Sequence, residues 1–280
     1  MVESAEGRRA PTAQRSRTVV VSFLGAIVRP MGAWMPISGT VDLLSQIGLD
    51  SASVRTAVSR LKANGWLQSE ARHGVRGYAL TDQATATLAA GDEVIWHSRQ
   101  PADLSEGWCV VNFSVPESIR SKRYQLRSHL AHLGFGNIGT AMWIAPARMR
   151  AAVETAVQEL ELSDYATIFV GDYVGPQDLT ALLYGSWDLA AIDQSYRDFS
   201  AAYKARVRRV EKQTPEPAEA FAMYLGVVDH WRKLPFRDPG LPTELLDKDW
   251  SGPAAAAIFE RLVSVLEKPA LAHAAIHWER

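Results

Sequence analysis

Residues 50–81 read DSASVRTAVSRLKANGWLQSEARHGVRGYALT, and the first half of this stretch has the pattern of an amphipathic helix. The apolar residues of one helical stripe are Val54, Ala57, Val58 and Leu61. Asp50 or Ser51 can cap the helix, because a short polar side chain accepts hydrogen bonds from the unpaired N–H groups of the first turn. Asn64 and Gly65 favour its end. The stretch therefore predicts a short helix between a polar cap and a glycine stop.

Further helices and a hairpin surround this predicted helix. Upstream, the apolar face of residues 18–28 ends at a proline, and a second helix is expected from Ser38, its cap, to Gly48. Downstream, short strands at 66–70 and 78–80 flank the turn ARHGVRG. Two helices joined by a tight turn and followed by a hairpin are typical of a winged helix-turn-helix, whose second helix enters the major groove of DNA.

The exposed face of this predicted recognition helix carries small polar residues between positive charges. A helix turns about 100° per residue, so small side chains lie opposite the apolar stripe and cations lie on both sides of them. Small side chains let the helix approach base edges, while the cations reach phosphates. The predicted DNA-binding residues are Ser51, Ser53, Arg55, Thr56, Ser59, Arg60 and Lys62 on the helix and Arg72, His73 and Arg76 on the hairpin. Gly74 and Gly77 are expected to let the hairpin turn pass close to DNA.

Positive charge is concentrated in this part of the chain. The 280 residues have a formal net charge of −1, yet residues 8–78 hold ten Arg or Lys and three Asp or Glu. The remainder of the chain is therefore acidic. Such an asymmetry favours a nucleic-acid-binding face on one domain. The net charge of the whole chain, by itself, does not indicate nucleic-acid binding.

The middle of the chain alternates between strand and helix patterns. Strands are expected at 108–115, 140–145 and 165–175, with helices at 118–133 and 147–162 between them. The motif GFGNIG reads as a loop. This alternation within about seventy residues favours a small α+β sandwich of the ferredoxin-like kind.

The last part of the chain has only helical patterns, at 179–213, 216–234 and 252–266. The fold class is therefore predicted as α+β. The expected organisation is a disordered tail at 1–17, a winged helix-turn-helix domain at 18–82, a linker helix at 83–104, a ferredoxin-like middle domain at 105–176 and a helical C-terminal domain at 177–280.

Motifs spread over the whole chain form a pattern that one family shares. They are VRTAVSRLKANGW at 54–66 followed by YALT, LRSHLAHLGFGNIGTAMWIAP at 126–146, SWDLAAIDQSYRDF at 186–199 and FRDPGLPTELLDKDWSG at 236–252. The first resembles the winged helix of the PaaX-type repressors of phenylacetate degradation, and the second resembles their middle domain. The last two resemble their C-terminal helical domain. The resemblance covers residues 39–266.

The resemblance implies a dimeric transcriptional repressor that binds double-stranded operator DNA. It also implies release from DNA by a small-molecule effector, an aryl- or acyl-CoA thioester such as phenylacetyl-CoA. The edge of the middle-domain sheet is the expected part of the dimer contact.

A site for such an effector is expected in the aromatic-rich C-terminal region. Trp187 and Trp231 can form the apolar wall of a pocket, and Arg232 and Arg237 can pair with phosphates at its mouth. The alternatives are that the aromatic residues fill a helical core and that Arg237 forms a structural ion pair with Asp238.

The sequence leaves two alternatives to DNA-dependent regulation open. The three-helix part resembles protein-docking domains, which would make the chain a non-catalytic interaction module. The middle domain resembles the ferredoxin-like nucleases of CRISPR systems, which need a metal-binding carboxylate near the end of the first strand. This chain has Asn112 and Ser114 there and no acidic residue before Glu117, so we expect no cleavage.

No catalytic constellation, metal site or cofactor is predicted. The pairs His129/His132 and His273/His277 have helical spacing but no acidic partner of the kind found in zinc hydrolases. Cys109 is the single cysteine, which excludes an intramolecular disulfide. The longest apolar run, 18–28, is too short to cross a membrane, and the polar N-terminus is unlike a secretory signal. We therefore expect a cytoplasmic protein without a membrane partner.

Overall fold

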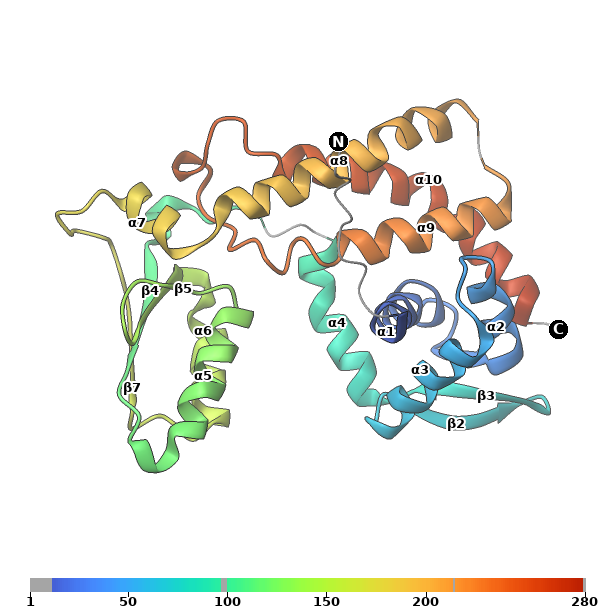
Figure 1. Ribbon diagram of the computed structural model, residues 1–280, viewed down its shortest axis with the longest axis horizontal. Helices are drawn as coiled ribbons and strands as arrows, with labels where there is room; N and C mark the ends of the chain where they lie inside the picture. Colours follow the sequence, from blue (N-terminus) through green and yellow to red (C-terminus); the bar gives the residue numbers. More distant parts are fainter. Residues whose placement is uncertain (1–11, 97–99, 214, 279–280) are drawn as a thin grey trace, which may run out of the picture. The chain divides into compact units, whose positions relative to one another are not determined.

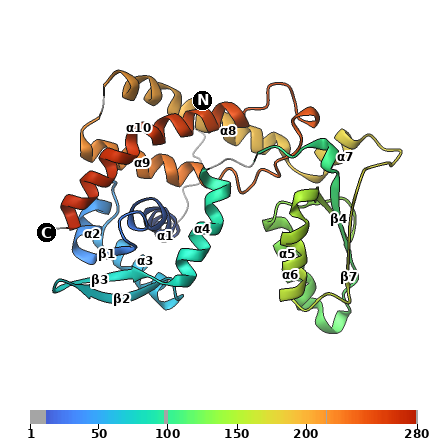
Figure 2. The ribbon, with the colours of Figure 1, turned by 180° about the vertical axis from the view of Figure 1, so that it is seen from behind.

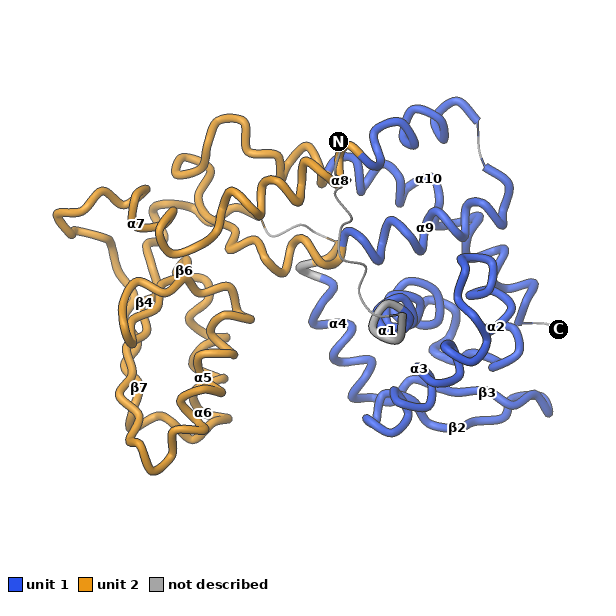
Figure 3. The backbone as a smooth tube through the Cα atoms, in the orientation of Figure 1, with its two compact units in different colours: residues 1–92, 202–231, 257–280 blue, residues 93–201, 232–256 orange. Residues whose placement is uncertain are grey.

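The computed structural model describes residues 12–96, 100–213 and 215–278 and combines helices with two small antiparallel sheets, in agreement with the α+β class (Figure 1, and from behind in Figure 2). The chain divides into two compact units (Figure 3). Unit 1 comprises residues 1–92, 202–231 and 257–280, and unit 2 comprises residues 93–201 and 232–256. Each unit thus draws on C-terminal segments, and the division into three successive domains stays a prediction.

Unit 1 begins with α1 (Thr12–Phe23), which continues into a π-helical turn (Leu24–Val28). The start of α1 corrects the expected disordered tail at 1–17, because residues 12–17 are helical while residues 1–11 lie outside the described part. The segment TAQRSR contains neither glycine nor proline, and Ser16 is only 1% exposed. The absence of helix breakers and the burial of Ser16 favour a helix over a free tail.

The next two helices are α2 (Ile37–Ser45) and α3 (Ser51–Ala63), in the predicted order. The N-cap residue of α2 is Pro36, not the expected Ser38, because the preceding strand ends there in an extended conformation. Gly48, which was expected to close α2, lies in the turn that follows the helix, with a φ of 83° that glycine adopts without steric strain.

A three-stranded sheet completes this part of unit 1, in the order β1 (Trp34–Pro36), β3 (Val75–Leu80) and β2 (Leu67–Arg72). The hairpin strands are longer than predicted, because the turn between them is only His73-Gly74. Both turn residues have positive φ, 50° and 80°, as in the two-residue turns that match strand twist. The sequence did not predict β1, which pairs Trp34 with Ala79 of β3. The hairpin leads into α4 (Asp82–Trp96).

Unit 1 is completed by α9 (Pro217–Trp231) and by parts of α8 (Leu189–Lys212) and α10 (Gly252–Trp278). In both ribbon views α1 lies between α9 and α3 (Figure 1, Figure 2). Phe23 of α1 meets Phe221 of α9 edge to face, with ring centroids 6.4 Å apart. The helix before the predicted helix-turn-helix is therefore packed into a helical core.

Helix α10 continues well beyond its predicted end at residue 266, with Pro269 inside it. Its buried face explains this, because Leu266, Ala270 and Ala274 follow one another at a spacing of four residues and are all fully buried. Burial of this stripe offsets the backbone hydrogen bond that proline cannot make.

Unit 2 contains a four-stranded antiparallel sheet with α5 (Arg120–His132) and α6 (Arg150–Glu159) on one face (Figure 1, Figure 2). The strands, in sheet order, are β5 (Gly136–Asn137), β6 (Met142–Pro146), β4 (Trp108–Phe113) and β7 (Ala166–Gly171). The chain order is β-α-β-β-α-β. Strand β5 lies within GFGNIG, which was predicted as a loop; a two-residue strand leaves no periodicity in the sequence.

The predicted helix 179–213 is two helices, α7 (Leu179–Ser186) and α8. The break has a local cause, because the Asp188 carboxylate accepts a hydrogen bond from the Ala191 N–H (3.0 Å) and so caps α8. It also has a tertiary cause, since the Trp187 ring covers Gly136, where a Cβ would lie 2.7 Å from the ring. Short 3₁₀ segments occur at Leu104–Glu106, Glu117–Ile119, Ala147–Met149 and Thr243–Leu245.

Candidate nucleic-acid interface

Helix α3 has one buried face and one exposed face, as its sequence predicts. The buried residues are Val54, Ala57, Val58 and Leu61. Thr56 and Ser59 are exposed on the opposite side, between the exposed guanidinium groups of Arg55 and Arg60. The exposed face is therefore free of covering chain within the described residues, and its small side chains leave the helix backbone accessible.

Asp50 caps α3, because its carboxylate accepts a hydrogen bond from the Ser53 N–H over 2.8 Å. Hydrogen bonds from the Ser53 side chain and backbone lower the pKa of Asp50. A carboxyl with a lowered pKa in the folded state stabilises the fold fully above its unfolded pKa and loses this contribution as the pH falls through its folded pKa.

Asp50→Ala is expected to lower the melting temperature of the chain by a few degrees at neutral pH, because the N–H groups of the first turn lose their acceptor. The difference from wild type should shrink below the ordinary carboxyl pKa of 3.8. Melting curves followed by circular dichroism at several pH values check this. Asp50→Asn is the control, since it caps without titrating; a pH-independent loss in Asp50→Ala would contradict the role of the charge.

The cations of α3 differ in how they are held. Arg55 is exposed and its Nε lies 3.4 Å from the Ser51 hydroxyl, one turn earlier. Lys62 donates to the Ser69 hydroxyl over 2.9 Å and so connects the end of α3 to β2. The Arg60 side chain forms no hydrogen bond or ion pair with the described residues. Arg55 and Arg60 can therefore reorient toward a ligand at little cost in stability, whereas Lys62 must give up a contact.

The hairpin residue Arg72 is engaged within the protein. Its Nε lies 2.5 Å from the Glu70 carboxylate, and its guanidinium lies 5.4 Å from the centroid of the Trp34 ring. Trp34 in turn donates its indole N–H to the Glu70 carbonyl oxygen over 3.2 Å. Arg72 thus braces β2 against β1. The sequence identified neither Trp34 nor Glu70, and only the pairing of β1 with β3 brings them together.

His73 and Arg76 are exposed on the hairpin, in agreement with a surface role. Gly77 has a different purpose from the one expected. It is buried, and a Cβ there would lie 2.5 Å from the Trp34 ring and 2.4 Å from the Met35 carbonyl oxygen. Gly77 therefore makes room for Trp34 of β1, while Gly74 supplies the positive φ of the turn.

The predicted effector residues lie in different surroundings. Trp231 is 1% exposed and stacks on Phe259, with centroids 4.8 Å apart and planes at 13°. Trp187 is half-buried and donates its indole N–H to the Gly134 carbonyl oxygen over 3.1 Å. The two tryptophans belong to different compact units. Trp231 is thus a core residue of unit 1, in keeping with the alternative that the aromatic residues fill a core.

Arg232 is half-buried and Arg237 is exposed, both in the segment that follows α9. Asp238, next to Arg237, accepts hydrogen bonds from the Tyr196 hydroxyl (3.0 Å) and the Gly240 N–H (2.8 Å). Arg148 donates to the Gly240 carbonyl oxygen over 3.0 Å. These contacts hold the proline-rich segment of unit 2 in place. The roles of Arg232 and Arg237 toward an effector stay predictions.

The candidate metal ligands and the cysteine have separate surroundings. Among the described residues there is no group of three His, Cys, Asp or Glu side chains placed to hold a metal ion. Within the middle sheet, burial raises the pKa of the Cys109 thiol to about 11, so this cysteine is protonated and unreactive at neutral pH. His129 forms a hydrogen bond with the Gln125 carbonyl oxygen, and His273 with the Gln46 side chain.

Comparison with known families assigns three successive segments, which make up most of the chain, to one family. Family models described as PaaX-like protein, PaaX protein central Cas2-like domain and PaaX-like protein C-terminal domain match residues 15–84, 101–183 and 187–276 in turn. The chain belongs to the PaaX family of transcriptional regulators. This confirms the resemblance, and the three matches follow the order of the motifs. In this PaaX-family chain α3 and the hairpin lie within the first match.

Two relatives cover nearly the whole PaaX-family chain. The transcriptional repressor PaaX of Escherichia coli (strain K12) is 24% identical over 261 residues, which are 91% of this chain and 81% of that protein. The solved structure of the uncharacterized protein Rv0674 from Mycobacterium tuberculosis covers 92% of this chain and 98% of its own, with a TM-score of 0.57 and 21% identity. The similarity to the Rv0674 structure shows that the two proteins share a fold. Among the described residues, no helix is long and apolar enough to span a bilayer.

Proposed function

We propose that this chain is a sequence-specific, DNA-binding repressor of a catabolic operon, with residues 18–82 acting as a winged helix-turn-helix. The observation that carries the proposal is the exposed face of α3, where Thr56 and Ser59 lie between Arg55 and Arg60. Such a face suits the major groove, because small residues approach base edges while guanidinium groups reach guanine or phosphate. The family match and the name of the Escherichia coli relative support repression. A repressor acts on chromosomal DNA, which supports a cytoplasmic location.

The repressor is proposed to act as a homodimer. Two recognition helices about 34–36 Å apart enter successive major grooves on one face of a duplex. The β-α-β-β-α-β order of unit 2 supports a ferredoxin-like middle domain, and its edge strand β7 carries Phe169 and Val170, which are 65% and 49% exposed. Apolar side chains on an open sheet edge suit a dimer contact. If light scattering gave the mass of one chain plus one duplex for the complex with DNA, the homodimer proposal would be contradicted.

Release from DNA is proposed to follow binding of an aryl- or acyl-CoA such as phenylacetyl-CoA, with phenylacetate catabolism as the regulated process. The resemblance to phenylacetate-degradation repressors supports this. Such an effector acts through its differential affinity for the DNA-binding and non-binding arrangements of the protein. Calorimetry with phenylacetyl-CoA, other acyl-CoA thioesters and free aromatic acids tests this. If none of them gave heat of binding, the effector proposal would fail and only the DNA-binding proposal would stand.

The DNA-binding proposal is tested by selection from random duplexes. The purified chain should enrich one sequence family, and the selected duplex should bind far more tightly than a shuffled one in a gel-shift titration. The alternative, a docking module that binds protein through its three helices, predicts that no duplex is enriched. Loss of duplex in the presence of Mg²⁺ would instead indicate the nuclease alternative.

The salt dependence of binding should distinguish the two wing arginines. Arg76 is exposed and lacks a side-chain partner within the described residues, so Arg76→Ala should reduce the slope of log K against log salt by about 0.9, as expected for one phosphate contact. Arg72→Ala should reduce it less, because Arg72 is held by Glu70 and Trp34. Equal reductions would indicate that Arg72 leaves Glu70 to contact a phosphate.

A further inference from the structure

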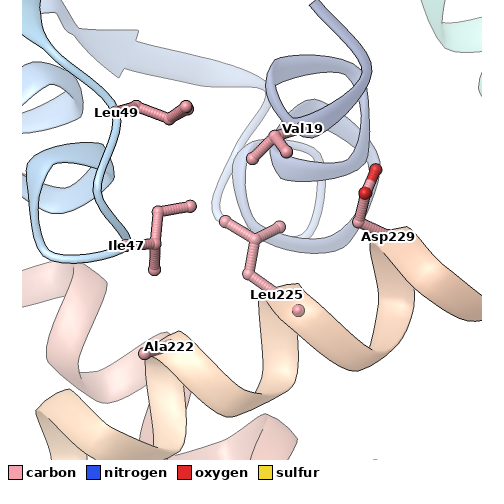
Figure 4. Close-up of a pocket in the computed structure, with 7 residues that line it drawn as sticks. Val19, Ile47, Leu49, Ala222, Leu225 and Asp229 are labelled. Carbon is pink, nitrogen blue, oxygen red and sulfur yellow. The ribbon is translucent and has the colours of Figure 1, made fainter. Parts of the chain in front are cut away.

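Unit 1 contains a half-open cavity of about 350 Å³ behind the predicted helix-turn-helix (Figure 4). Three separate segments line it. Val19 comes from α1, Ile47 and Leu49 come from the connection between α2 and α3, and Leu225 comes from α9. In Figure 4 the side chains of Ile47 and Leu225 extend toward one another across the space. The volume falls in the range of small-molecule pockets in proteins, and the lining is mainly apolar.

Gly226 of α9 also lines this cavity, and the fold does not need a glycine there. Its φ is not positive, and a Cβ would meet nothing within 4 Å among the described residues. Glycine in a helix interior destabilises the helix relative to alanine. Neither backbone conformation nor close packing offsets this cost at Gly226. What the missing side chain provides is room in the cavity.

One carboxylate marks the cavity wall, that of Asp229, one turn beyond Leu225 on α9. Its Oδ1 accepts a hydrogen bond from the Ser22 hydroxyl of α1 over 2.7 Å. A carboxylate accepts hydrogen bonds from a ligand and repels an anion, and the otherwise apolar lining disfavours the burial of any charged group. The cavity therefore suits an uncharged molecule with an apolar body and a hydrogen-bond donor.

We propose that this cavity is a binding site for a small, neutral, largely apolar molecule that carries an amide or hydroxyl donor, and that its occupancy alters DNA binding. The residues that line the cavity differ from the predicted acyl-CoA residues, whose expected ligand is a polyanion. Binding in the cavity does not depend on the proposed function; the effect on DNA does.

The coupling follows from where the cavity lies. Leu49 is 7% exposed and directly precedes Asp50, the residue that caps α3. Ile47 and Leu49 flank Gly48, whose φ of 83° reverses the chain after α2. A ligand that fills the space between these two side chains and α9 contacts the connection that sets the position of α3. Differential affinity for two positions of this connection is sufficient for coupling.

Benzamide and benzoate are the probes, because they share a shape and differ in charge and in the donor group. In ligand-observed NMR titrations of the full chain, benzamide should bind saturably and benzoate should bind at least about tenfold more weakly. Gly226→Leu fills the cavity and should weaken benzamide binding at least about tenfold. Gly185→Leu is the matched control, since Gly185 is also an exposed helical glycine with open space around its Cβ position and lies in unit 2.

Asp229→Asn provides a second variant that keeps the size of the side chain. It should remove most of the preference for benzamide over benzoate, because the repulsive charge is gone. Circular dichroism should give folded spectra for all variants. The proposal is overturned if benzamide does not saturate, if it binds Gly226→Leu as well as wild type, or if benzoate binds wild type as tightly as benzamide.

The effect on DNA is measured with the selected duplex. Saturating benzamide should change the dissociation constant of the wild-type complex by about fivefold or more and leave Gly226→Leu unchanged. An unchanged wild-type dissociation constant would refute the coupling. If no duplex is enriched in the selection, the proposed function fails while the benzamide titrations still decide whether the cavity is a site.

Discussion

The double substitution Arg55→Ala and Arg60→Ala is expected to weaken binding to the selected duplex by about 100-fold or more, since each arginine contact with DNA contributes about 1–3 kcal/mol. The two guanidinium groups lie on either side of the exposed small residues of α3. If α3 enters a DNA groove as proposed, both groups face that groove. Among the described residues, Arg55 has one long side-chain hydrogen bond, to Ser51, and Arg60 has none, so we expect the fold to tolerate loss of both side chains. The loss should therefore appear in affinity and not in stability.

Gel-shift titration at fixed salt measures the effect, and thermal melting verifies the fold. Arg208→Ala is the control, because Arg208 is an exposed arginine of unit 1 on α8 and not on α3. Each single substitution should show part of the loss. If the double variant binds as tightly as the control, α3 is not the helix that contacts DNA and the proposed function loses its main support.

Replacing Trp231 by alanine is expected to destabilise unit 1 by about 3–5 kcal/mol, the usual cost of truncating a buried tryptophan. The ring is 1% exposed and stacks on Phe259 of α10, which is also 1% exposed. Removal of the ring leaves a cavity that a packed helical core cannot close. Denaturant unfolding followed by circular dichroism measures the change.

Trp187→Phe serves as the comparison for Trp231→Ala. Trp187 is half-buried, and its replacement removes one hydrogen bond to Gly134 while an aromatic ring is kept. The expected loss is about 1 kcal/mol. If Trp231→Ala were no less stable than Trp187→Phe and instead weakened effector binding, Trp231 would belong to a ligand site as predicted, and the core assignment would be wrong.

Helix α3 was predictable in nearly every detail, because all its signals are local. Three features define the helix: the apolar stripe from Val54 to Leu61, the Asp50 cap and the Gly65 stop. Each involves residues within a few positions of one another, so each can be recognised from the sequence. The same holds for the exposure of Thr56 and Ser59, which follows from helical periodicity once the buried stripe is known.

Other features were invisible or misread because their stability comes from distant segments. Strand β1 is three residues long and gains its hydrogen bonds from β3, more than forty positions later. Strand β5 is shorter still. Helix α10 passes Pro269 because Ala270 and Ala274 are buried by other helices of unit 1. The break before α8 could have been found from Asp188, a good N-cap residue within a helical pattern.

Local sequence was enough to establish a capped amphipathic helix, its positive exposed face and the hairpin that follows, since backbone capping, turn conformation and side-chain periodicity act over a few residues. The partners of the side chains came from the folded chain. Long-range packing engages Arg72 with Glu70 and Trp34, buries Trp231 and assembles the cavity around Gly226 from α1, α9 and the α2–α3 connection. Contacts of this kind depend on which distant segments pack together in the fold, and this cannot be inferred from a few neighbouring residues of the sequence.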